Sequence, residues 1–65
     1  MNLIEGIQEE LKRCQELKTV YESIGPAGFF GLSVVNQSIT RAEKAVASGD
    51  VTEMLRAYRD LKERE

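Results

Sequence analysis

The chain has 65 residues and a formal net charge of −2, and 31% of its residues are charged. This length allows one small domain, predicted over residues 1–65. The acidic balance argues against a long nucleic acid as partner, and no apolar run approaches the roughly 18 residues of a membrane span. With one cysteine, Cys14, and no histidine, neither an intrachain disulfide nor a zinc site is available. We therefore expect a cytoplasmic protein without metal or cofactor.

The first predicted element is a helix over residues 3–24. Asn2 followed by Glu5 has the pattern of a capping box, in which the side chains satisfy early backbone N–H groups. Apolar residues recur at spacings of three and four, which is typical of one helix face. They are Ile4, Ile7, Leu11, Cys14, Leu17, Tyr21 and Ile24.

The next segment, residues 25–31, holds three of the five glycines, the only proline and both phenylalanines. Pro26 suits the first position of a helix, where its missing N–H is no loss. Gly28 and Gly31 then fall in the first turns, where each glycine costs about 1 kcal/mol relative to alanine. Such a cost indicates either a close backbone approach or a ligand at the helix N-terminus.

Two further helices are predicted, over residues 27–48 and 51–63. Gly49 suits the left-handed position that ends a helix, and Asp50 suits the N-cap of the next. The tail, residues 62–65, is expected to fray. The apolar stripes of the two helices are Leu32, Val35, Ile39, Ala42 and Val46, then Val51, Met54, Leu55, Tyr58 and Leu61.

These patterns predict an all-α fold: a long antiparallel helical hairpin with a shorter third helix. Three stripes can share one core, but Phe29, Phe30 and Val34 lie outside the main stripe of the second helix. Uncovered apolar surface of this kind marks interfaces, and a symmetric homo-oligomer is the simplest way to cover it.

The segment around residues 25–31 is also the candidate ligand site. A helix N-terminus attracts phosphate, glycines let a ligand approach closely, and aromatic rings stack on bases. The candidate ligand-binding residues are Lys18, Tyr21, Gly25, Pro26, Ala27, Gly28, Phe29 and Ser33. The alternative is a tight turn whose glycines serve packing alone. Catalysis is not expected, because histidine is absent and the paired carboxylates lie on polar faces.

The second helix resembles that of the phage anti-CBASS proteins, which sequester cyclic oligonucleotides. The resemblance covers about residues 3–47 and depends on Phe30-Gly31-Leu32-Ser33 and on Ala42, Ala45, Val46 and Ala47. It implies a compact helical homo-oligomer, with a hexamer as the expected assembly, that binds cyclic di- or trinucleotides between protomers without cleaving them. The family's N-terminal contact residues have no counterpart in this sequence.

Two functions from different classes follow from these observations. The first is non-enzymatic sequestration of a cyclic nucleotide messenger, which would block host antiphage signalling. The second is a small helical adaptor or inhibitor that acts through a protein–protein interface. A third possibility is a purely structural assembly piece.

Overall fold

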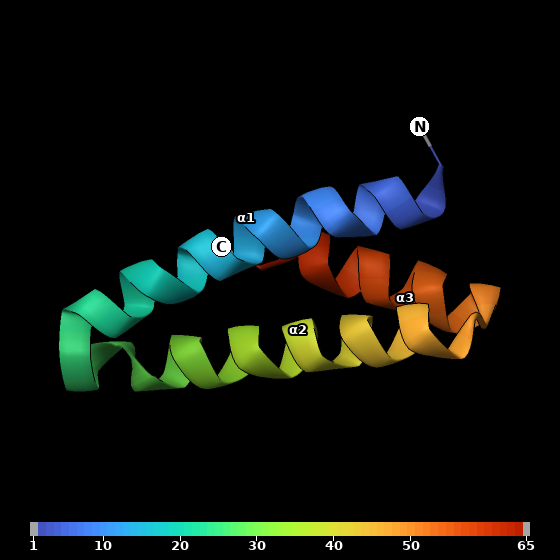
Figure 1. Ribbon diagram of the computed structural model, residues 1–65. Helices are drawn as coiled ribbons and strands as arrows, with labels where there is room; N and C mark the ends of the chain where they lie inside the picture. Colours follow the sequence, from blue (N-terminus) through green and yellow to red (C-terminus); the bar gives the residue numbers. More distant parts are fainter. Residues whose placement is uncertain (1, 65) are drawn as a thin grey trace.

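The computed structural model describes residues 2–64, and this part of the chain is almost entirely helical. Helix α1 (Leu3–Ile24) and helix α2 (Phe29–Ser48) form an antiparallel hairpin, and the shorter helix α3 (Val51–Lys62) packs against both (Figure 1). The predicted all-α fold, with a long hairpin and a shorter third helix, is confirmed. Across residues 2–64, every helix is too short or too polar to cross a membrane.

The connection between α1 and α2 differs from the prediction. Gly25–Gly28 form a short 3-10 helix, η1, with Pro26 in its first turn, and the α-helix begins only at Phe29. Because Pro26 lacks an N–H and has a fixed φ, it is compatible with the start of this tight turn. The hairpin is therefore closed by four residues that are themselves helical.

Local side-chain chemistry sets the other helix ends. The Oδ1 of Asn2 accepts a hydrogen bond from the Glu5 N–H at 2.8 Å, and Asp50 does the same for the Glu53 N–H at 3.2 Å. Gly49 has a φ of +72°, the left-handed conformation that ends α2 and that glycine adopts without steric cost. Both caps and the glycine stop were visible in the sequence.

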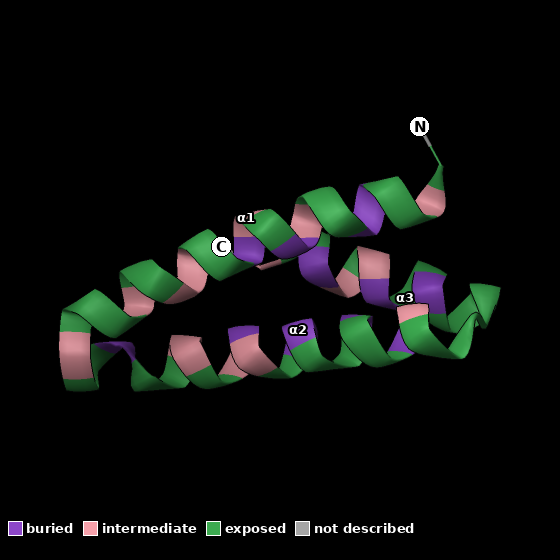
Figure 2. Cartoon of the chain, viewed as in Figure 1, coloured by how far each residue is buried: buried purple, intermediate pink, exposed green. Residues whose placement is uncertain are grey.

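The buried core lies where all three helices meet. Figure 2 shows the buried residues concentrated on the inner faces of the half of the hairpin that α3 covers. Alanines allow α2 and α3 to approach closely, and larger aliphatic side chains from α1 and α3 fill the space between. The buried apolar residues are Ile7, Leu11, Cys14, Val35, Ile39, Ala42, Ala45, Met54, Ala57 and Leu61.

Helix α3 covers only part of the hairpin. It has 12 residues and α1 has 22, so α3 is shorter by roughly 15 Å at 1.5 Å per residue. Figure 1 shows α3 beside the half of the hairpin that lies away from η1, and the end of α3 contacts the middle of α1. Next to η1, the hairpin therefore consists of α1 and α2 alone, and no third helix packs against them.

Candidate interaction surface

The glycines near the turn bring the two hairpin helices into close contact. A Cβ on Gly28 would lie 2.3 Å from the backbone oxygen of Tyr21, and a Cβ on Gly31 would lie 2.5 Å from the Tyr21 ring. Gly28 faces backbone atoms, so any side chain there would require the two segments to move apart, whereas a side chain at Gly31 would require the Tyr21 ring to shift. The tight-turn alternative thus accounts for the two glycines that the sequence marked as costly.

The remaining predicted ligand-binding residues surround this contact. Gly25 has a φ of +80°, whereas Pro26 and Ala27 are exposed on η1. Lys18 is half-buried on α1, one turn before Tyr21. Phe29 and Ser33 are exposed, one turn apart on α2. The structure brings Tyr21 together with Gly28, and an anion site formed by this set stays a prediction.

A groove opens between α1 and α2 directly beyond the end of α3. Its volume is about 190 Å³, and Glu63 and Arg64 close one end of it. We call it the hairpin-end groove. Phe30 stands on its rim with 84% of its surface exposed. Its other lining residues are Tyr21, Gly31, Val34 and Val35.

The groove continues the path of α3 along α1. Gly6 lies under the ring of Tyr58 on α3, and Arg13 reaches the last carbonyls of α3. At spacings of three and four, the same helix face continues through Leu17, Val20 and Ile24. Val20 and Ile24 are exposed, although they are apolar. The α1 face that holds α3 is therefore apolar and uncovered near the turn.

Helix α2 shows the same continuation. Arg41 and Ser38 face Asp60 and Arg64 at the end of α3. Four residues before Ser38 comes Val34, and four before that comes Phe30, so both lie on the face that contacts α3 further along. Phe29 is offset from Phe30 by about 100° around the helix, so the two exposed phenylalanines point in different directions.

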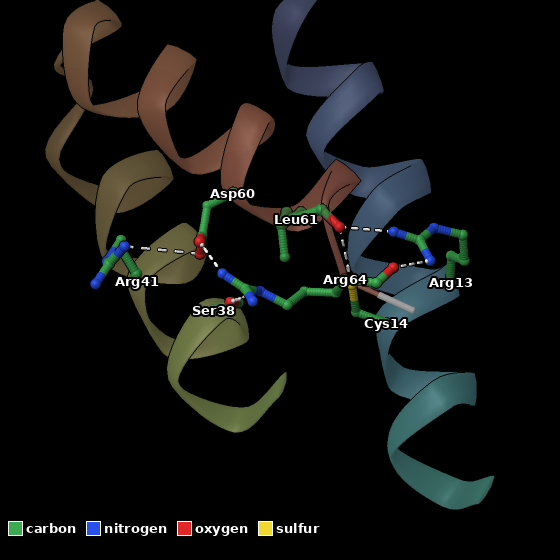
Figure 3. Close-up of polar contacts among 7 residues, drawn as sticks. All are labelled: Arg13, Cys14, Ser38, Arg41, Asp60, Leu61 and Arg64. Carbon is green, nitrogen blue, oxygen red and sulfur yellow. Dashed lines mark hydrogen bonds and ion pairs between the residues drawn. The ribbon is translucent and has the colours of Figure 1, made fainter. Parts of the chain in front are cut away.

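Arg13 fixes the end of α3 against α1. Its Nη1 donates to the Arg64 carbonyl at 2.7 Å and its Nη2 donates to the Leu61 carbonyl at 2.6 Å (Figure 3). The last carbonyls of a helix have no partner within the helix, and a cation is favourable at this negative end of the helix dipole. These bonds fix where α3 stops and where the groove starts.

Arg64 fixes the same end against α2. Its Nε donates to the Ser38 Oγ at 2.8 Å and its Nη2 donates to the Asp60 Oδ1 at 2.6 Å, while Arg41 lies 3.7 Å from Asp60 (Figure 3). The prediction that the tail frays is therefore wrong for Arg64, whose side chain bridges two helices. Residue 65, which the prediction also included, lies outside the described residues.

The Cys14 thiol lies beneath this end of α3. It is buried, and its Sγ donates to the Leu61 carbonyl at 3.6 Å. Burial raises the pKa of the Cys14 thiol above its ordinary value, against the opposing charge of Arg13. Because the thiolate is the reactive form, Cys14 is an inert part of the core, as its helical position predicted.

The acid sensitivity of the fold is expected to depend on Asp60. Burial opposes its ionisation, but hydrogen bonding from Arg64 and Ser38 and the charges of Arg64 and Arg41 outweigh burial and lower the pKa of the carboxyl. A lowered folded-state pKa adds stability above the unfolded-state value near 4, and this stability is lost as the pH falls through the folded-state pKa.

We therefore expect Asp60→Asn to be less stable than the native chain at pH 6 and to lose less stability between pH 6 and pH 3. Urea unfolding followed by circular dichroism at both pH values measures the two differences. Glu43→Gln, an exposed carboxylate on α2, is the control. Equal acid sensitivity of the native chain and Asp60→Asn would contradict the role of Asp60.

The sequence itself carries a signal for this surface. No charged side chain occurs between Ser23 and Thr40, although 31% of the chain is charged. Both phenylalanines lie in this uncharged segment. Depletion of charge together with aromatic residues is the composition of interface cores. Val20 is a further apolar residue of α1 outside the stripe predicted for the core, whereas Ile24 belongs to that stripe and is exposed in the structure.

Comparison with protein-family models, with curated proteins and with solved structures found no match to this chain. The resemblance to the anti-CBASS proteins therefore remains a prediction based on residues 3–47.

Proposed function

We propose that this chain is a non-enzymatic protein-binding module, an adaptor or inhibitor, that holds its partner at the hairpin-end groove. One observation carries the proposal. Phe30 has 84% of its surface exposed, and it lies beside the part of the hairpin that α3 does not cover. Large aromatic side chains at the edge of a pocket are the residues that contribute most to binding energy in protein interfaces.

The chemistry of the groove favours a protein partner. Its walls are apolar, and its charged neighbours are Glu63 and Arg64, which have opposite signs. Grooves of this kind accept the apolar face of an amphipathic helix, whose side chains enter at spacings of three and four. Such a helix would occupy the position that α3 occupies further along the hairpin.

A photo-crosslinking amino acid tests this function directly. Irradiation of cells that produce Phe30→p-benzoylphenylalanine is expected to give a discrete protein adduct, because the exposed position accepts the larger benzophenone side chain and places it against a bound partner. The same change at Leu55 serves as the control, since Leu55 is exposed on α3 outside the groove. A discrete adduct at both positions, or at neither, would contradict the proposal.

Cyclic nucleotide sequestration is the second candidate. It is supported by Phe29 and Ser33, which are exposed one turn apart on a face of α2 away from the groove, where a ring and a hydroxyl are both open to a ligand. Calorimetry with cyclic di- and trinucleotides tests it, with Phe29→Ser expected to weaken binding. Recovery of intact nucleotide would exclude cleavage, and no binding to the native chain would contradict sequestration.

A further inference from the structure

At the hairpin-end groove, α1 and α2 pack against each other without the further helices that would complete a helix bundle. The third-helix position along the hairpin is occupied by α3 up to Glu63 and Arg64, and it is open from there to η1. We propose that the hairpin end of a second copy of this chain fills it, which gives a two-fold symmetric dimer. This inference rests on the proposed function, because it names the partner of the same groove.

The lengths of the helices define the arrangement. Helix α3 has ten residues fewer than α1, and Glu63 and Arg64 extend past its end, so each copy leaves less than roughly 15 Å of hairpin uncovered. When two hairpin ends overlap in opposite directions, each fills the open length of the other, and the η1 turn of one copy meets the end of α3 of its partner. The four overlapping helix ends then form a four-helix bundle at the centre of the dimer.

The composition of the hairpin end favours a second copy over a charged partner. Between Ser23 and Thr40 there is no charged side chain, and the two charges that line the groove, Glu63 and Arg64, have opposite signs, so a partner of a single charge gains little there. A second copy contributes the same uncharged surface, which includes Val20, Ile24, Phe30 and Val34. In a two-fold interface the same patch serves both subunits, so it must be complementary to itself.

A dimer of this kind needs only a limited part of the surface of the chain. A stable interface buries about 800 Å² on each partner, which is under a fifth of the 4485 Å² surface of this chain. The uncovered hairpin end comprises the last turns of α1, all of η1 and the first turns of α2. Its tip, residues 25–28, is compact and uncharged, as contact with the end of a partner's α3 requires.

Sedimentation equilibrium of the purified chain tests the dimer. The native protein is expected at twice its 7.3 kDa chain mass at micromolar concentration. Phe30→Ser is expected to weaken association at least tenfold, because Phe30 sits at the groove, and Leu55→Ser is expected to leave it unchanged. Both residues are exposed, so neither change disturbs the core. A monomeric native chain, or a dimer equally stable in Phe30→Ser, would overturn the inference.

The antiparallel overlap has its own test. Thiols are introduced together as Ala27→Cys on η1 and Glu63→Cys just beyond the end of α3. In the dimer they meet between copies, so mild oxidation is expected to give a covalent dimer from the double variant and none from either single variant. Absence of the covalent dimer would overturn the arrangement. A monomer in solution that still gives a Phe30 adduct to another protein in cells would contradict only this inference and leave the proposed function standing.

Discussion

Replacing Gly28 with alanine is expected to unfold most of the protein under conditions where the native chain is folded. An alanine in a helical backbone normally gains about 1 kcal/mol over glycine. At Gly28 the new Cβ would lie 2.3 Å from the Tyr21 oxygen and 3.1 Å from the Tyr21 carbonyl carbon. These are backbone atoms, so relief requires the two helices to separate. Overpacking costs about 1–3 kcal/mol and sometimes more, and a core of this size supplies about 3–5 kcal/mol in total.

Urea unfolding followed by circular dichroism at 222 nm measures this loss. Gly6→Ala is the matched control, because Gly6 is also a helical glycine but its Cβ would meet only the Tyr58 ring at 3.1 Å. That half-buried side chain can shift by a few tenths of an ångström, so we expect little change in the unfolding free energy. If Gly28→Ala were as stable as the native chain, the close approach of α1 and η1 would be wrong.

The closeness of that contact explains why sequence reasoning reached two interpretations of the same glycines. The sequence shows that Gly28 and Gly31 are costly in a helix, and this cost has to be offset elsewhere. It does not show that Tyr21, seven residues before Gly28, is the residue that occupies the space. The packing contact removes the need for a ligand to explain the glycines, although it leaves room for one on the exposed side of α2.

The helices themselves were predictable because their signals are local. Asn2, Gly49 and Asp50 act within three or four residues of their positions, through caps and a left-handed stop. The end of α3 is different, because Arg13 and Arg64 make their contacts across large sequence separations. Where α3 stops relative to the hairpin follows from those contacts, and so does the existence of the groove.

The groove in turn depends on how firmly α3 is docked, and Leu61 is the side chain that decides this. Leu61 is fully buried, whereas Leu55 on the same helix is 54% exposed. Leu61→Ala is expected to reduce the free energy of unfolding by about 2–5 kcal/mol, the usual loss for a buried leucine. Leu55→Ala is the same chemical change at an exposed position and is expected to cost far less, within about 0.5 kcal/mol of the native chain.

Two measurements report whether α3 is docked in Leu61→Ala. A detached 12-residue helix is marginal in water, so the helical signal at 222 nm is expected to fall even without denaturant. Detachment also uncovers Cys14, whose thiol contacts the Leu61 carbonyl, so its reaction with a thiol reagent is expected to accelerate in Leu61→Ala and not in Leu55→Ala. Equal thiol protection in both variants would mean that α3 does not cover Cys14. The groove would then not end at Arg64, because the contacts that end it are the ones that hold α3 in place.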